Sequence, residues 1–333
     1  MAVPERYRDI LVIDLLGGLG DLVMVLPVVH ALARRHPGAA LRLLTHAPGD
    51  ALVSADPAVT EVRRAARGHE PEAVRAELDR RRPDLVVSTT RYGGIPDEIQ
   101  ARGMRAVTDL WRHPPPDVPV TTRYLQILHA EGLIDAVDAA TARPVIRLTP
   151  EERRAGRSGL DALAPSGSPV LLVPGAGMAV KRWPHWPALV AALLAGGAPT
   201  LVVPEPGSGV APPAGTVALP PTDLRGLAAW FAAVAHRHGV VIGGDTGPLR
   251  VAAAVGARTV GLFGPTAAAR YGLPAPALDL QGLPDCPHRR PTAITEQVCW
   301  WDAHCPLAGS GPACMADIDV DRVLAAAHRA STA

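Results

Sequence analysis

Short apolar runs recur along the whole chain, and most of them end close to a glycine or a proline. Each run is rich in branched residues and too short for a helix, and longer helical stretches separate many of the runs. This alternation predicts buried strands of parallel sheets with helices on their faces, which is an α/β architecture with doubly wound sheets. The predicted strands cover residues 9–14, 41–45, 84–88, 105–110, 145–148, 169–173, 199–203, 240–242 and 259–263.

The alternation occurs twice, and a chain of 333 residues is long enough for two cores. We therefore predict two Rossmann-like domains, at residues 1–150 and 165–315, followed by a closing helix within residues 316–333. The boundary is placed in residues 135–168, where charged residues and a Pro/Ser/Gly cluster interrupt the pattern.

Residues 240–266, VVIGGDTGPLRVAAAVGARTVGLFGPT, hold two predicted strands, each ending in a glycine turn. A helix must begin just after the first turn, and helix N-termini at strand ends bind anions. The segment predicts a cradle for a phosphorylated ligand; the alternative is a pair of tight turns that need glycine only for their geometry. Residues predicted to bind are Asp245, Thr246, Gly247, Gly264, Pro265 and Thr266.

Two further strand ends in the second half carry charged residues. Lys181 and Arg182 follow the strand at 169–173, and a point charge beside a bidentate fork suits a pyrophosphate, although a solvated basic turn is the alternative. Glu205 follows the strand at 199–203, where carboxylates bind ribose hydroxyls in other nucleotide sites. Together these strand ends predict a nucleotide-diphosphate site.

In the first half, a turn with Gly18 and Gly20 follows the first predicted strand, and Asp21 comes directly after it. Gly18 and Gly20 are predicted to contact the nucleotide-diphosphate donor. The turn lacks the G-x-G-x-x-G spacing, which argues against a nicotinamide cofactor. Asp21 is placed to cap the next helix or to act in catalysis, or both. The loop at residues 89–96 is a second glycine-bearing strand end, whose Arg91 and Tyr92 we expect to contact a substrate.

The net charge is +1 and no run of like charges occurs, so nucleic acid is not an expected partner. The first residues lack a signal-peptide pattern and no apolar stretch is long enough to span a membrane. We expect a cytoplasmic protein, with peripheral contact to a membrane left open.

All four cysteines fall near the end of the chain, at C-x12-C-x5-C-x8-C spacing. This is not a standard zinc pattern, so structural thiols are favoured over a metal site or disulfides. The four are Cys286, Cys299, Cys305 and Cys314.

Four stretches of the chain together resemble glycosyltransferase family 9, the ADP-heptose:lipopolysaccharide heptosyltransferases and their relatives. They are GGLGDLVMVLP, PGAGMAVKRWP, the DTG-to-FGPT block and the CMADIDVDRVLAA tail, in the family's order. The resemblance implies a GT-B fold, in which two Rossmann-like domains face a central cleft, the donor binds the C-terminal domain and the final helix crosses back to the first. It also implies an inverting, metal-independent activity without a cofactor.

By the same resemblance, Asp21 matches the family's proposed catalytic base and Lys181 its residue on the donor phosphates. Glu205 matches the carboxylate on the ribose, and residues 245–247 match the turn that holds the donor's sugar and pyrophosphate. The family pattern has a histidine three residues after DTG, whereas this chain has Arg250. Arg250 is expected to bind phosphate, and the change puts the identity of the sugar or nucleotide in doubt.

The predicted function is therefore transfer of a heptose or related sugar from a nucleotide-diphosphate donor, ADP-heptose first, to a hydroxyl group. The acceptor is a glycan, a lipid-linked molecule or a natural product. Two alternatives remain open at this point: a nucleotide-sugar 2-epimerase of the same fold, and a non-catalytic protein that binds sugar nucleotides.

Overall fold

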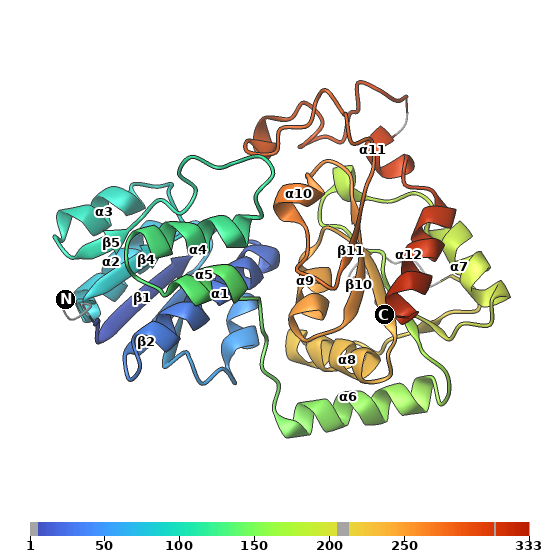
Figure 1. Ribbon diagram of the computed structural model, residues 1–333, viewed down its shortest axis with the longest axis horizontal. Coiled ribbons are helices and arrows are strands. Elements are labelled where there is room, and N and C mark those ends of the chain that lie inside the picture. The colour runs from blue at the N-terminus through green and yellow to red at the C-terminus, as the bar shows by residue number, and fades with distance from the viewer. Residues whose placement is uncertain (1–5, 205–212, 310, 333) are drawn as a thin grey trace. The chain divides into compact units, whose positions relative to one another are not determined.

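The computed structural model describes residues 6–204, 213–309 and 311–332. The chain separates into two compact units (Figure 1). Unit 1 comprises Met1–Pro114 and Val120–Arg147, and unit 2 comprises Pro115–Pro119 and Leu148–Ala333. Each unit is a parallel sheet with helices packed on it, so the α/β prediction is confirmed for both.

The sheet of unit 1 has the order β3-β2-β1-β4-β5 in the part of the chain that the structure describes, and all its pairs are parallel. Its strands are β1 (Asp9–Asp14), β2 (Ala40–Thr45), β3 (Glu61–Arg64), β4 (Leu85–Ser88) and β5 (Arg105–Val107). The strand order reverses between β1 and β4. In open α/β sheets, ligands bind at the carboxyl ends of strands at such a reversal.

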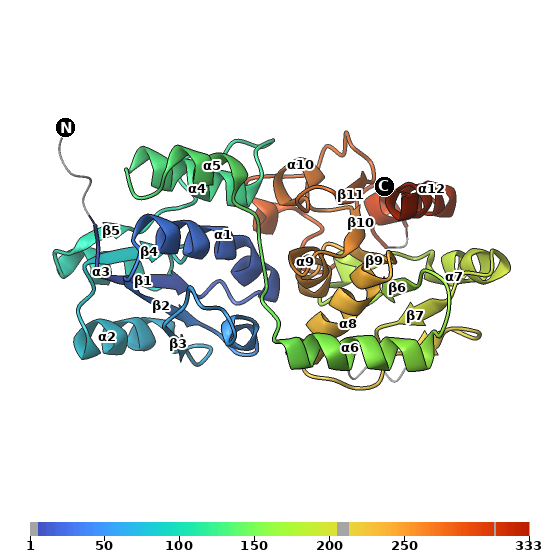
Figure 2. The ribbon, with the colours of Figure 1, turned by 60° about the horizontal axis from the view of Figure 1, so that its bottom comes forward.

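Helices cover both faces of this sheet (Figure 2). Side chains of β1 alternate between the faces, and Leu11 and Ile13 pack with Val74 of α2 and Ile99 of α3 in one buried cluster. Helices α1, α4 and α5 form the layer on the other face. The helices are α1 (Leu19–Arg35), η1 (Gly49–Val53), α2 (Glu70–Arg80), α3 (Ile95–Ala101), α4 (Val120–Ala130) and α5 (Ala136–Thr141).

The sheet of unit 2 has the order β11-β10-β9-β6-β7-β8, again with parallel pairs throughout the described residues. Its strands are β6 (Val170–Val173), β7 (Thr200–Val202), β8 (Val217–Ala218), β9 (Val240–Gly244), β10 (Arg258–Phe263) and β11 (Leu278–Gln281). Here the order reverses between β6 and β9. The strand ends predicted to bind the nucleotide therefore meet at the reversal of this sheet.

One core of unit 2 lies between the sheet and the pair α7 and α12, where Leu189, Val323 and Ala326 are fully buried. On the other side of the unit, α6 packs on α8 so closely that a Cβ on Gly156 would lie 2.3 Å from the Ala229 carbonyl oxygen. The helices are α6 (Pro150–Leu163), η2 (Ala179–Lys181), α7 (Trp186–Ala195), α8 (Leu224–His236), α9 (Gly247–Ala254), α10 (Ala268–Tyr271), η3 (Ile294–Glu296), α11 (Ala313–Ala316) and α12 (Val320–Thr332).

One sequence prediction near the domain boundary needs correction, and the packing of the last helix on the first domain stays a prediction. The last helix, α12, packs on β9, β10, β11 and α7 of its own unit, because its apolar side chains complete the core of unit 2. Residues 145–148 do not form a strand. The boundary region instead contributes α6 to unit 2, and a full capping box at Thr149 and Glu152 starts this helix.

No helix among the described residues is both long enough and apolar enough to cross a membrane.

Candidate functional site

Two cations surround the buried carboxylate of Asp245, which follows directly after β9. Its Oδ2 accepts hydrogen bonds from Lys181 Nζ and from the Thr266 hydroxyl, both at 2.9 Å. Its Oδ1 accepts one from Arg250 Nη2 at 2.7 Å. Burial alone would raise the pKa of Asp245, but the two cations outweigh it and lower the pKa to about 2.

This cluster joins three of the predicted strand ends: the loop after β6, the DTG turn after β9 and the GPT turn after β10. Asp245, Lys181 and Thr266 were predicted from the sequence as members of one site, and the structure brings them into direct contact. The predicted role of these residues in donor binding stays a prediction.

Lys181 is the only lysine in the sequence, against 33 Lys and Arg residues in total. Its Nζ also donates to the Asp245 carbonyl oxygen at 3.1 Å and lies 5.4 Å from the centre of the Trp300 ring. A compact ammonium presents its charge in any direction, whereas a guanidinium needs a planar partner. Every other Lys or Arg position of the chain holds arginine.

Arg250 lies inside the unit, with 7% of its surface exposed. Its Nη2 donates to Asp245 and also to the Tyr271 carbonyl oxygen. The guanidinium therefore balances the charge of Asp245 and ties α9 to the end of α10. Phosphate binding by Arg250 remains an untested prediction.

The N-terminus of α9 begins at the predicted DTG turn. Thr246 is the N-cap residue in an extended conformation, and Gly247 opens the helix with Pro248 in its first turn. The Thr246 hydroxyl oxygen is buried and has no hydrogen-bond partner within the described part of the chain. A buried hydroxyl without a partner at a helix N-terminus is a group that a bound anion would satisfy.

Gly264 of the second turn serves packing. A Cβ there would lie 2.4 Å from Met315 Sδ, so only glycine fits without a shift. Its carbonyl oxygen accepts from Arg289 Nη2 at 2.9 Å and from Gln281 Nε2 at 3.1 Å. Pro265, between Gly264 and the buried Thr266, is buried as well.

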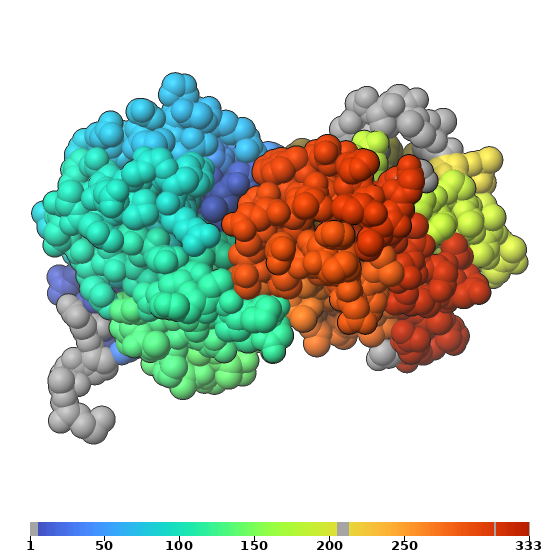
Figure 3. All heavy atoms as spheres, turned by 90° about the horizontal axis from the view of Figure 1, so that it is seen from above, coloured from blue at the N-terminus to red at the C-terminus, as the bar shows by residue number. Residues whose placement is uncertain are grey.

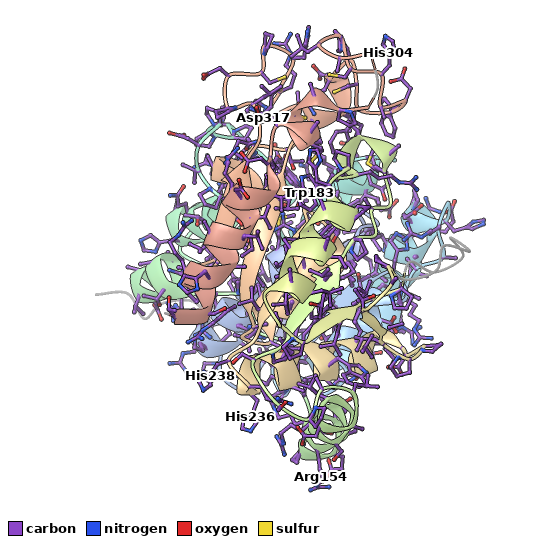
Figure 4. All side chains as sticks on the ribbon, turned by 90° about the vertical axis from the view of Figure 1, so that its right-hand side faces the viewer. Arg154, Trp183, His236, His238, His304 and Asp317 are labelled. Atoms are coloured by element: carbon purple, nitrogen blue, oxygen red, sulfur yellow. The ribbon has the colours of Figure 1, made fainter. Side chains whose placement is uncertain are left out.

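The remaining predicted residues of this unit differ in their surroundings. Arg182 is exposed. Trp183 packs in the core, and its indole N–H donates to the Ile318 carbonyl oxygen at 2.8 Å. Figure 4 shows it at the end of unit 2 nearer to Asp317 and His304, with Arg154 at the far end. Glu205 lies outside the described residues.

In unit 1, Asp21 lies in the first turn of α1. Gly18 is the N-cap residue, so the interpretation of Asp21 as the N-cap is wrong. A Cβ on Gly18 would lie 2.3 Å from Asp21 Oδ2, which means that the carboxylate folds back over this glycine. Gly20 lies within the same first turn. Pro27 lies inside the continuous α1.

A polar cluster that the sequence did not predict surrounds the end of β1. Asp14, the last residue of β1, is 2% exposed and accepts a hydrogen bond from the Thr89 hydroxyl at 2.6 Å. Burial and then the neighbouring Asp21 raise the pKa of Asp14 to about 7, against the opposing effect of the Thr89 bond. The only signal in the sequence was a charged residue closing the strand DILVID, whose four central residues are apolar.

The predicted acceptor residues belong to the loop after β4. Tyr92 is 43% exposed, and its hydroxyl donates to the Leu15 carbonyl oxygen at the end of β1. Arg91 is exposed beside it. Arg67 was not predicted, and its Nη2 donates to the Gly17 carbonyl oxygen at 2.7 Å. The loop and the glycine turn therefore share one edge of the sheet.

The four cysteines are free thiols that line one small cavity together with His288. Cys299, Cys305 and Cys314 are buried, and burial raises the pKa of the Cys314 thiol to about 12. Among the described residues, no three His, Cys, Asp or Glu side chains lie together as a metal ion would require. The orange-red surface in Figure 3 belongs to the C-terminal part of unit 2, which contains these cysteines.

The model of glycosyltransferase family 9 (heptosyltransferase) matches residues 92–283, which is more than half of the chain. These residues include the β4 loop from Tyr92 onward, Lys181, the DTG turn and the GPT turn. No protein of curated function matches the chain by sequence.

Several solved structures share the fold. A family 9 glycosyltransferase from Veillonella parvula DSM 2008 has a TM-score of 0.74 at 17% identity, covering 100% of this chain and 99% of its own. E. coli ADP-heptose LPS heptosyltransferase II has a TM-score of 0.66 at 19% identity, with 97% and 98% covered. E. coli heptosyltransferase WaaC, solved with ADP, has a TM-score of 0.61 at 16% identity, with 87% and 98% covered.

Proposed function

The chain belongs to glycosyltransferase family 9, and from this premise we propose that it transfers a heptose or related sugar from ADP-heptose to an acceptor hydroxyl with inversion at the anomeric carbon. Transfer of a glycosyl group follows from the family. The donor, the acceptor and the roles of individual residues are the proposal.

The observation that carries the proposal is the environment of Lys181. Its ammonium is held at the reversal of the unit 2 sheet by Asp245, close to the N-terminus of α9. A lysine, a helix N-terminus and the unpartnered Thr246 hydroxyl are three groups that stabilise a diphosphate. All three belong to strand ends that the family model includes.

ADP is the first candidate for the nucleotide because a structural relative, E. coli WaaC, was solved with it. The acceptor is proposed only by class, as a hydroxyl on a glycan, a lipid-linked molecule or a small natural product. Arg91 and Tyr92, exposed on the β4 loop, are the residues proposed to contact it.

The proposed reaction is a single displacement. The Asp21 carboxylate takes the proton of the acceptor hydroxyl, and the oxygen attacks the anomeric carbon from the side opposite the diphosphate. The bond from that carbon to the diphosphate oxygen breaks, and Lys181 and the α9 N-terminus stabilise the charge of the leaving group. Attack from the opposite side inverts the configuration.

A thermal-shift panel with ADP-, GDP-, UDP- and dTDP-sugars tests the donor. A ligand at 100 times its Kd stabilises the folded protein by about 2.7 kcal/mol, which is readily measured. We expect ADP-heptose to give the largest shift. A larger shift with another nucleotide sugar would identify that nucleotide sugar as the donor and would not change the proposed class of reaction.

Incubation with ADP-heptose alone tests the class of reaction. A transferase hydrolyses its donor slowly when water replaces the acceptor, so we expect ADP and free heptose. An ADP-sugar epimerised in the heptose ring would instead show an isomerase and contradict the proposal. The same incubation with EDTA tests metal independence, which predicts an unchanged rate.

A further inference from the structure

Asp14 differs from the other described buried acids of unit 1 in the partner of its carboxyl group. Of the six buried Asp and Glu side chains that the structure describes there, five have a basic partner within ion-pair distance. Asp14 has none among the described residues, and its hydrogen bond comes from the neutral Thr89 hydroxyl. The five paired acids are Asp9, Asp50, Asp56, Glu77 and Asp138.

The contrast holds within a single strand. Asp9 begins β1 and accepts two hydrogen bonds from Arg42, at 2.9 Å and 2.7 Å. Asp14 ends the same strand, fully surrounded by protein apart from 2% of its surface. A buried carboxylate without a cation is costly in its ionised form, so it keeps its proton to a higher pH.

The hydroxyl of Thr89 fits a protonated Asp14. Its Oγ1 lies 2.6 Å from Asp14 Oδ1 and 3.3 Å from the Ile13 carbonyl oxygen, and both are acceptors when Asp14 is ionised. One hydroxyl hydrogen cannot serve both. If Asp14 carries a proton, its carboxyl group donates to Thr89 Oγ1, and the Thr89 hydroxyl is free to donate to Ile13.

The charged and titratable groups around this point come from several other segments. Asp21 on α1 acts directly on Asp14 and disfavours a second negative charge. Tyr92 lies close enough for Asp14, Glu70 and Arg67 to act on its pKa. His46, at the end of β2, lies 3.3 Å from Glu70 and so faces that carboxylate.

We propose that Asp14 is a positioning residue for the transfer: it retains a proton that it shares with the Thr89 hydroxyl, and so leaves the neighbouring Asp21 as the ionised carboxylate. Two carboxyl groups in one site ionise in succession, and the more buried one ionises last. The inference rests on the proposed function in one respect, the role of Asp21 as the base. The burial and the pairing of Asp14 are independent of it.

The first test compares thermal unfolding of the wild type and Asp14→Asn from pH 5 to pH 8. Asparagine has nearly the same shape as protonated aspartate and cannot ionise. The pKa of Asp14 is about 7 in the folded state against 3.8 for an ordinary aspartate, so wild type loses stability as the pH rises from 3.8 to about 7, with no further loss above that pH. The melting temperature of Asp14→Asn minus that of wild type should therefore increase with pH.

Asp56→Asn is the matched control. Asp56 is equally buried, but His30 Nε2 lies 2.7 Å from it and helps to hold its pKa below the ordinary value despite burial. Its stabilising contribution is fully present above pH 3.8 and is lost only in stronger acid, so the Asp56→Asn difference should stay constant from pH 5 to pH 8. A constant difference between Asp14→Asn and wild type at every pH would overturn the proposal.

The second test follows turnover of ADP-heptose between pH 6 and pH 8. The ratio of the Asp14→Asn rate to the wild-type rate should change at least twofold across pH 7, because only wild type gains a charge beside Asp21. A ratio independent of pH would mean that Asp14 has only a structural role. If Asp21→Asn turns over as wild type does, the proposed base fails, while the stability comparison still reports on the proton of Asp14.

Discussion

At the scale of single residues, the site of unit 2 depends on how one buried carboxylate is neutralised. Asp245 is 8% exposed and is held by Lys181 and Arg250. In the family pattern a histidine is expected at the position of Arg250. Here Arg250 is buried and donates to Asp245 Oδ1, which helps to keep the carboxylate ionised. Lys181 donates to the other carboxylate oxygen, Oδ2.

Asp245→Asn should lower the free energy of unfolding by about 3 kcal/mol at pH 7, because it leaves the buried Arg250 and the partly buried Lys181 without their counter-charge. The folded pKa of Asp245 is about 2 against 3.8 ordinarily, so its contribution is present above pH 4 and is lost as the pH falls towards 2. Urea unfolding at pH 7 and at pH 3 measures both values. Asp279→Asn is the control, since burial raises the pKa of Asp279 to about 7. An equal loss for Asp245→Asn at both pH values would contradict the ionic account.

Asp21→Ala should reduce turnover about 10²–10⁴-fold, the usual contribution of a positioned base. Binding of the donor should survive, because the groups proposed to hold the diphosphate belong to unit 2. Steady-state rates and a donor titration on the same preparation separate the two effects. Unchanged turnover would remove Asp21 from the mechanism.

At the scale of elements, the glycine turn before α1 sets the position of Asp21. A Cβ at Gly18 would meet Asp21 Oδ2 at 2.3 Å, and the carboxylate is the flexible end of a side chain that can move aside. Gly18→Ala should therefore leave the melting temperature close to that of wild type. It should still reduce turnover about 10²-fold, because a displacement near 1 Å has that effect on a positioned group. Normal turnover would show that the carboxylate does not need this position.

The elements could be predicted from the sequence where the pattern was strong. Strands such as β1, β6 and β9 are continuous apolar runs buried on both faces, and each was predicted. Strand β3 is the polar EVRR at a sheet edge, and β11 is the half-buried LDLQ, so neither shows a strand pattern. Only the tertiary pairing with a neighbouring strand makes them strands.

The candidate site shows the same limit. Lys181, Asp245 and Thr266 were predicted because each follows a recognisable strand. Asp14 and Trp300 were missed, since the first ends a strand that otherwise looks purely structural and the second lies in an irregular segment. Whether a charged side chain is paired or unpaired after folding cannot be deduced from local sequence.

At the scale of the whole molecule, each unit completes its own core. Unit 2 does so with α12, whose Val323 is fully buried against the sheet. The amphipathic sequence of this helix predicts that it needs an apolar partner but not which one. Within unit 2 the helix packs on β9, β10, β11 and α7. Its packing on the first domain, which the resemblance to the family implies, stays a prediction.

Val323→Ala should lower the free energy of unfolding by about 2 kcal/mol, through lost burial and the cavity that remains. The matched control is Val298→Ala in the same unit, where the valine is 60% exposed and the expected change is within about 0.5 kcal/mol. Denaturant unfolding compares the two variants. An equal effect would show that α12 does not contribute to the core as described.

The central claim is that the site around Lys181 and Asp245 binds the diphosphate of a nucleotide sugar. Calorimetric titration of ADP into wild type and Lys181→Met tests it most directly, because methionine keeps the length of the side chain and removes the only lysine charge in the protein. We predict that wild type binds ADP and that the variant, with its melting temperature checked, binds at least tenfold more weakly, a loss of about 1.4 kcal/mol. Equal affinity in the two proteins, or no binding of ADP to the wild type, would contradict the claim.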